Sequence, residues 1–214
     1  MVALNLLLIA FLSYVMGSIP TSIWIAKIVY GMDIRAHGSG NAGATNVFRI
    51  LGWKPALAVV VVDVAKGFVP AYYLFQIRFA EISWDPVYLQ LLAGFAAIVG
   101  HVYTIFAGFR GGKGVATAAG MLLALYPLAT PICILVFAVV VGMTRIVSLA
   151  SITAAASLPV VLLVLVYGFD RQVPMPLVVL SFAVAAFIAF THRSNIQRLV
   201  RGEEHRFGQK KEPQ

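Results

Sequence analysis

The sequence predicts an all-α integral membrane protein with seven transmembrane helices, an N-terminus outside the cell and a C-terminus in the cytoplasm. Hydrophobic residues make up 61% of the 214 residues and charged residues only 11%, whereas soluble domains carry about 25% charged residues. The mean hydropathy is +0.92. So few polar groups cannot cover a water-soluble core. Most of the chain is therefore expected to lie in lipid as helices, which satisfy their own backbone hydrogen bonds.

Seven apolar segments follow one another along the chain. They cover residues 3–29, 55–77, 86–108, 115–126, 128–143, 147–167 and 174–191. The long ones suffice to cross a hydrocarbon core of about 30 Å. Gly17 and Pro20 interrupt the first segment and predict a kink or break there. Pro127 and Pro131 favour two helices over one long helix across residues 115–143.

The distribution of basic residues decides the number of crossings. With seven crossings, all of the 16 Lys and Arg residues except Lys66, Arg78 and Arg171 fall on one side. Six crossings would scatter the basic clusters over both sides. Because basic residues gather in cytoplasmic loops, this side is expected to be cytoplasmic. Residues 1–201 are expected to form a single transmembrane domain, followed by a polar, disordered cytoplasmic tail at 202–214.

The net charge of +8 has two explanations. Basic residues set the topology and attract anionic lipid headgroups, or they bind anionic substrates. Nucleic acid is not an expected partner, because the basic residues lie in short loops at a membrane surface. Cys133 is the only cysteine, which excludes disulfides and cysteine-based metal sites.

The first cytoplasmic loop has the composition of an anion site. Residues 38–49 read GSGNAGATNVFR. Glycines let backbone N–H groups approach a ligand, and successive N–H groups form an anion-binding concavity. Hydroxyl, amide and guanidinium groups add further donors. These side chains are Ser39, Asn41, Thr45, Asn46 and Arg49. A merely flexible loop is the alternative, but flexibility alone does not require so many donors.

The second cytoplasmic loop, GFRGGKG at residues 108–114, resembles a nucleotide-binding P-loop without being one. Its spacing is one residue too long, and Gly114 replaces the hydroxyl that would hold magnesium. Gly111 and Gly112 still offer amides and Lys113 a positive charge. A helix is expected to begin just afterwards, with its positive end facing the loop. The sequence thus predicts two phosphate-binding loops on one face, unless the basic residues only anchor topology.

Polar residues at the ends of other apolar segments complete this face. Ser148 begins the sixth segment, and His192 and Asn195 are spaced to share a helix face. Asp63 and Lys66 lie three apart within an apolar segment. Ionisable groups are costly there unless they are paired, so a mutual ion pair is expected. His101 is expected to be structural.

Five blocks of the sequence resemble the bacterial acyl-phosphate:glycerol-3-phosphate acyltransferases. They are GSIP at 17–20, GSGNAGATNVFR at 38–49, GHVYTIFAGFRGGKGVAT at 100–117, RIVSLAS at 145–151 and THRSNI at 191–196. The resemblance implies seven helices in the bacterial inner membrane and a cytoplasmic active site. It also implies transfer of a fatty acyl group from acyl phosphate to the sn-1 hydroxyl of glycerol 3-phosphate. The products would be lysophosphatidic acid and inorganic phosphate, in phospholipid biosynthesis.

The resemblance and the loop chemistry together give the candidate site. The catalytic candidates are Ser39, Asn41, Lys113, Ser148 and His192. The substrate-binding candidates are Thr45, Asn46, Arg49, Gly111, Gly112, Gly114 and Asn195. One phosphate is expected at the second loop, and the phosphate of glycerol 3-phosphate at Arg49, His192 and Asn195, although the sequence does not fix which loop holds which phosphate. Acyl phosphate, glycerol 3-phosphate and membrane lipids are the expected partners of a monomer, with no metal and no cofactor.

The mechanism and two other functions stay open at this point. No histidine is followed five positions later by aspartate, so a His–Asp base at that spacing is absent. Acyl phosphate is already activated, and catalysis then needs mainly positioning and charge stabilisation. The hydroxyl proton would pass to a substrate phosphate oxygen or to His192. A transporter of a phosphorylated metabolite or lipid would place its sites near the midplane, and a noncatalytic lipid-binding subunit would not need two loops.

Overall fold

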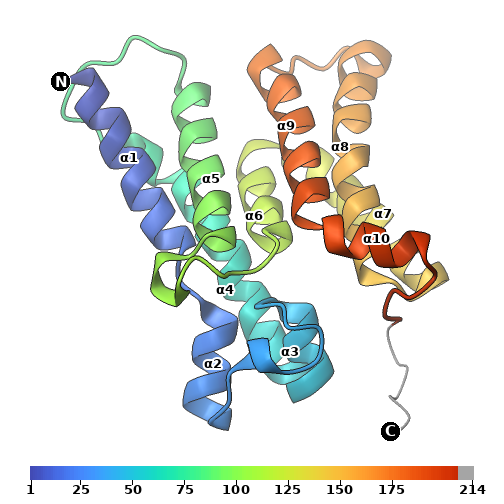
Figure 1. Cartoon of the computed structure of the whole chain (residues 1–214). Helices are drawn as coiled ribbons and strands as arrows, with labels where there is room; N and C mark the ends of the chain where they lie inside the picture. The colour runs from blue at the N-terminus through green and yellow to red at the C-terminus, as the bar shows by residue number, and fades with distance from the viewer. Residues whose placement is uncertain (207–214) are drawn as a thin grey trace, which may run out of the picture. The chain divides into compact units, whose positions relative to one another are not determined.

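The computed structural model describes residues 1–206, and every regular element in this range is helical (Figure 1). Two compact units divide the chain, Met1–Pro127 and the residues from Leu128 onward. The all-α prediction is confirmed for the described residues.

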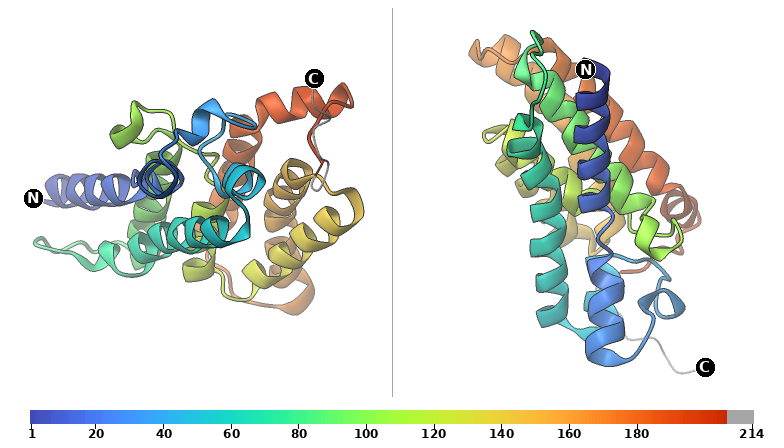
Figure 2. Two further views of the ribbon diagram at one scale, coloured as in Figure 1. Left: turned by 90° about the horizontal axis from the view of Figure 1, so that it is seen from below. Right: turned by 90° about the vertical axis from the view of Figure 1, so that its left-hand side faces the viewer.

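The first unit contains six α-helices and three short 3₁₀ turns. They are α1 (Val2–Gly17), α2 (Thr21–Tyr30), η1 (Ile34–Ala36), α3 (Ala44–Leu51), α4 (Trp53–Tyr72), η2 (Leu74–Gln76), α5 (Pro86–Val102), η3 (Ile105–Ala107) and α6 (Val115–Leu125). Helix α1 packs mainly against α5, and α4 packs mainly against α6. The two further views in Figure 2 show α1 alongside α5. Side chains that face away from these contacts are apolar and exposed, as Leu7 (67%) and Phe11 (62%) are on α1.

Glycines let both helix pairs approach closely. A Cβ on Gly67 of α4 would collide with the carbonyl oxygen of Thr117, and one on Gly120 of α6 would collide with that of Val64. The pair α1 and α5 repeats this arrangement through Gly17 and Gly100. Small residues at such crossings are the usual basis of helix association in lipid, because apolar burial gives little driving force there.

The first apolar segment is broken, as predicted. Helix α1 ends at Gly17 and α2 begins at Thr21, because Pro20 lacks an N–H group to continue the helix. Side chains from other helices reach the carbonyl groups at the break. Thr104 donates to the carbonyl of Ser18, and Lys66 Nζ donates to that of Ile19 at 2.8 Å. These bonds satisfy backbone groups that a broken helix exposes.

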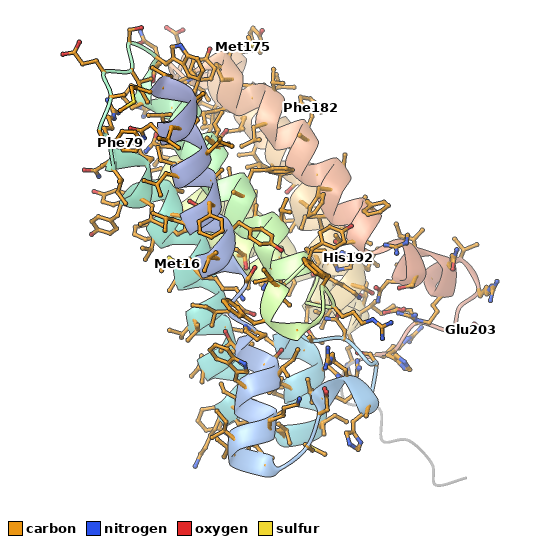
Figure 3. The ribbon with its side chains drawn as sticks, turned by 60° about the vertical axis from the view of Figure 1, so that its left-hand side comes forward. Met16, Phe79, Met175, Phe182, His192 and Glu203 are labelled. Atoms are coloured by element: carbon orange, nitrogen blue, oxygen red, sulfur yellow. The ribbon has the colours of Figure 1, made fainter. Side chains whose placement is uncertain are left out.

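The described part of the second unit contains four helices. They are α7 (Ala129–Thr144), α8 (Val147–Phe169), α9 (Met175–Thr191) and α10 (Arg193–Val200). Helix α8 packs against both α7 and α9. Helices α9 and α10 meet at an angle of 65°, and Figure 3 shows His192 at this bend, at the opposite end of α9 from Met175.

All seven predicted apolar segments are helical, but the helices differ in length. Within residues 1–206, four helical stretches are long and apolar enough to cross a membrane, and a fifth is formed if α9 and α10 make one bent span. Helices α6 and α7 are apolar but shorter. The 11 residues of α6 extend about 16 Å, against a hydrocarbon core of about 30 Å. Seven crossings and the orientation of the termini therefore stay predictions.

The predicted break between the fourth and fifth segments is confirmed. Helix α6 ends at Leu125 and α7 begins at Ala129, with Pro127 between them. Pro131 lies in the first turn of α7, where a missing N–H group is tolerated. The predicted disordered tail is partly wrong, because Glu204 accepts hydrogen bonds from α8 and α10. Residues 207–214 of that tail lie outside the described range.

The glycine contact between α4 and α6 predicts a specific loss of stability. Gly120→Ala is expected to destabilise the protein by about 1–3 kcal/mol, the usual cost of overpacking. Gly142→Ala is the control, because nothing lies within 4 Å of a Cβ there. Thermal unfolding in detergent measures both. Equal melting temperatures for the two variants would contradict the close packing of α4 and α6.

Candidate active site

The first glycine-rich segment is half loop and half helix. Helix α3 begins at Ala44, so the predicted loop was wrong for its second half, and Thr45, Asn46 and Arg49 lie on a helix. Asn46 is fully buried, and its side chain ties the preceding loop together. Its Oδ1 accepts from the Ser39 amide at 2.9 Å, and its Nδ2 donates to the carbonyls of residues 34 and 37. The Ser39 amide is therefore occupied.

Arg35 connects the turn before this segment to the turn before the second loop. Its guanidinium donates to Asp33 Oδ2 at 2.8 Å through one nitrogen and to the carbonyl oxygen of Ala107 in η3 at 2.9 Å through the other. Hydrogen bonds from Arg35 lower the pKa of Asp33 to about 2, although burial opposes this shift. The pKa of Arg35 is raised in return. The pair stays charged at all physiological pH values, and Arg35 joins η1, which precedes the first loop, to η3, which precedes the second.

Two backbone amides of the second loop donate hydrogen bonds within the protein. The amides of Gly111 and Gly112 donate to the carbonyls of Val102 and His101 at 3.0 and 3.1 Å. Both amides are therefore engaged within the protein, and their contact with a phosphate stays a prediction. Gly114 has φ +83°, a conformation that side chains disfavour, and α6 begins directly after it, as predicted.

A small polar cavity lies beneath the two loops. It is lined by Pro20, Thr21, Ser22, Ala42, Asp63, Lys66, His101, Thr104, Gly111 and Gly112. Lys66 Nζ lies 2.8 Å from Asp63 Oδ1, and both side chains are 3% exposed. The expected ion pair is thus confirmed. Because Ala42 comes from the first loop and Gly112 from the second, both loops meet at this cavity.

In the second unit, the Glu204 carboxylate accepts hydrogen bonds from three side chains. Ser148 Oγ and Asn195 Nδ2 donate to its Oε1 at 2.9 and 2.6 Å, and Arg198 Nε donates to its Oε2 at 2.7 Å. Burial alone would raise the pKa of Glu204, but the three hydrogen bonds outweigh it and lower the pKa below its ordinary value. As a charged carboxylate, Glu204 therefore holds two of the predicted site residues, Ser148 and Asn195.

His192 is buried at the bend between α9 and α10. Its Nδ1 lies 2.8 Å from the carbonyl oxygen of Ile188. A carbonyl oxygen only accepts, so Nδ1 carries the proton, and in the neutral ring Nε2 presents a lone pair. This tautomer suits a group that accepts a proton through Nε2.

The two units each hold part of the predicted site. The first contains Ser39, Asn41 and Lys113, of which Ser39 is exposed and the other two are half-buried. The second contains Ser148 and His192, both buried. Thr45 is half-buried and Arg49 exposed on α3. Their contacts with substrate stay predictions.

The sequence analysis missed two residues that hold the site. Glu204 stands beside Glu203 in a segment that also holds four arginines between 193 and 206, and these two carboxylates were the available signal. Arg35 was assigned only to topology, and only its position three residues before the Gly38-containing loop pointed to more. Their distant contact partners, Ser148 and Ala107, are too far away in sequence to be inferred.

These features define an integral membrane protein that presents two glycine-containing, cationic loops at the ends of apolar helices. The family model of glycerol-3-phosphate acyltransferases matches residues 7–202. The glycerol-3-phosphate acyltransferase of Chlorobium phaeobacteroides (strain BS1) is 43% identical, over 94% of this chain and 96% of its own. That of Salinibacter ruber is 46% identical, over 94% and 91%.

Two solved structures have the same fold. The crystal structure of PlsY (YgiH), an integral membrane glycerol 3-phosphate acyltransferase, in its glycerol 3-phosphate form is 38% identical to this chain. It matches with a TM-score of 0.80 over 95% of this chain and 96% of that one. The lysophosphatidic acid form of PlsY gives a TM-score of 0.78. The chain therefore belongs to the glycerol-3-phosphate acyltransferase family, integral membrane enzymes of phospholipid synthesis.

The lowered pKa of Glu204 predicts a pH-dependent contribution to stability. At pH 7, Glu204→Gln is expected to cost about 1.5–3 kcal/mol, the range for hydrogen bonds to a charged group. The folded-state pKa lies below the ordinary value of 4.5. The contribution is therefore complete above about pH 4.5 and is lost as the pH falls through the folded-state value. Thermal unfolding of wild type and variant between pH 7 and pH 3 measures it.

Glu203→Gln is the matched control, because Glu203 is the exposed neighbour of Glu204. It is expected to leave stability unchanged over the whole pH range. A destabilisation by Glu204→Gln that stays constant down to pH 3 would rule out the charged carboxylate as its source.

Proposed function

We propose that the protein transfers a fatty acyl group from acyl phosphate to the sn-1 hydroxyl of glycerol 3-phosphate. Membership of the glycerol-3-phosphate acyltransferase family supports the acceptor, and PlsY has been crystallised in glycerol 3-phosphate and lysophosphatidic acid forms. The observation that carries the proposal here is the meeting of two cationic, glycine-containing loops at one cavity. The cationic side chains of these loops suit phosphorylated ligands.

The reaction needs little covalent chemistry from the protein. The sn-1 oxygen attacks the acyl carbonyl carbon, a C–O ester bond forms, and the bond between that carbon and the bridging phosphate oxygen breaks. Inorganic phosphate leaves and lysophosphatidic acid remains. Because the mixed anhydride is already activated, holding the reactants in place and stabilising the developing charge supply most of the acceleration.

Side chains carry most of the phosphate binding in this proposal. The amides of Ser39, Gly111 and Gly112 are engaged within the protein. Lys113, half-buried at the start of α6, and the positive end of that helix supply charge to one phosphate. Arg49 on α3 supplies a planar fork to the other. The Ser39 hydroxyl and Asn41 serve as donors to the reacting groups.

His192 is proposed to act in the second unit with Ser148 and Asn195. Its Nε2 lone pair gives the hydroxyl proton one possible destination, and a phosphate oxygen of the substrate gives the other. Ser148 and Asn195, held by Glu204, are assigned to substrate positioning. The protein is further proposed to act as a monomer that crosses the bacterial inner membrane seven times, with its loops in the cytoplasm.

Phosphate release tests the reaction. Purified protein given palmitoyl phosphate and glycerol 3-phosphate is expected to release inorganic phosphate only when both are present. Lys113→Ala is expected to lower kcat by about 100-fold or more, because it removes a charge that stabilises the transition state. Lys54→Ala is the control, since it removes an exposed lysine of the same unit outside both loops. No release from folded wild-type protein would refute the proposal and favour transport.

His192→Ala separates the two proton routes. If Nε2 accepts the hydroxyl proton, kcat is expected to fall about 100- to 10,000-fold, the usual contribution of general-base catalysis. A rise in KM for glycerol 3-phosphate with unchanged kcat would contradict the histidine route and leave a substrate phosphate oxygen as acceptor. Steady-state kinetics at saturating palmitoyl phosphate distinguish these results.

A further inference from the structure

We infer that Asp63, Lys66 and His101 form a buried positioning cluster that sets the second loop, residues 108–114, for acyl transfer. The inference rests on the proposed function, since it concerns how the loop that carries Lys113 is held. The three residues come from α4 and α5 and line the same cavity as Gly111 and Gly112.

On one side, the cluster holds the break between α1 and α2. Lys66 Nζ donates to the carbonyl of Ile19 at 2.8 Å and pairs with Asp63 at 2.8 Å. Thr21 Oγ1 donates to Asp63 Oδ1 at 3.3 Å. One ion pair on α4 thus contacts the residue before Pro20 and the residue after it, and fixes the direction in which α2 leaves the break.

On the other side, His101 links the ion pair to the second loop. Its Nδ1 lies 3.8 Å from Asp63 Oδ1 and has no hydrogen-bond partner among the described residues. Its carbonyl accepts from the Gly112 amide. A Cβ on Gly112 would collide with His101 Nε2, so the loop lies directly against the imidazole. The ring therefore separates the buried charges from the turn that precedes Lys113.

Packing alone does not explain why charges occupy this place. Gly67 and Gly120 already bring α4 and α6 together, and Gly17 and Gly100 do the same for α1 and α5. An apolar pair in place of a buried ion pair is often as stable or more stable. Ionisable groups inside apolar helices are costly and commonly functional. Their contacts here run to the break and toward the second loop, which indicates positioning.

The test removes both charges together, so that neither is left buried alone. Asp63→Asn with Lys66→Met in one chain is expected to keep the protein folded at a lower melting temperature, because the carbonyl of Ile19 loses its donor, whereas each single change also leaves a group that has lost its charged partner. Kinetic constants are measured by phosphate release at a temperature well below unfolding. A spin label on Phe109→Cys, in a Cys133→Ala background, reports the mobility of the second loop, since Phe109 is 58% exposed.

If the cluster positions the loop, the double variant loses about 100-fold in kcat/KM, the effect of misplacing a reacting group by about 1 Å. The label on Phe109→Cys becomes more mobile at the same time. A double variant with wild-type kcat/KM, or one whose label mobility is unchanged, overturns the inference. Absence of phosphate release from the wild-type protein refutes the proposed function instead, and the label then decides whether the cluster holds the loop.

Asn5→Leu is the matched control for a merely structural effect. Asn5 is a fully buried polar residue of the same unit. Its side chain donates to the carbonyl of Ile77 and accepts from the amide of Phe79. It lies 13 positions before Ser18 on α1, or about 20 Å along the helix. Asn5→Leu is expected to lower the melting temperature with kcat/KM and label mobility unchanged. A loss of kcat/KM equal to that of the double variant would overturn the assignment of positioning to the cluster.

Discussion

The first unit depends on how it satisfies the backbone between α1 and α2. The chain leaves the helix at Gly17 and re-enters it at Thr21, among apolar helices. A hydroxyl from Thr104 and an ammonium from Lys66 reach the carbonyls at the break. The ammonium needs Asp63 beside it, and the helices that bring these groups must approach closely. The broken helix, the buried ion pair and the glycine contacts therefore depend on one another.

The two glycine-containing loops meet at the cavity that adjoins this break. In the second loop, Gly111 and Gly112 permit close approach to the end of α5 at the cavity. Their amides and that of Ser39 are engaged in hydrogen bonds within the protein. In the proposed reaction, a phosphorylated ligand contacts mainly the side chains of Arg49 and Lys113 and the start of α6. With an activated acyl donor, that reaction needs positioning more than covalent catalysis.

Local chemistry in the sequence predicted what nearby residues decide. Proline and glycine located the break in the first segment, and a spacing of three located the pair of Asp63 and Lys66. The sequence did not predict contacts between distant segments, because these contacts depend on how the helices pack. Nothing in the sequence indicated that the amides of Gly111 and Gly112 would bond to the end of α5. Nor did it show that Glu204, 56 positions after Ser148, would hold that hydroxyl.

The fate of the bridging oxygen of acyl phosphate tests the account most directly. Palmitoyl phosphate with ¹⁸O between carbon and phosphorus is turned over with glycerol 3-phosphate, and both products are analysed by mass spectrometry. Attack at the carbonyl carbon predicts that the label leaves entirely in inorganic phosphate and that lysophosphatidic acid is unlabelled. Label retained in a fatty acid, with no labelled phosphate, would show cleavage at phosphorus and contradict acyl transfer by the positioned loops.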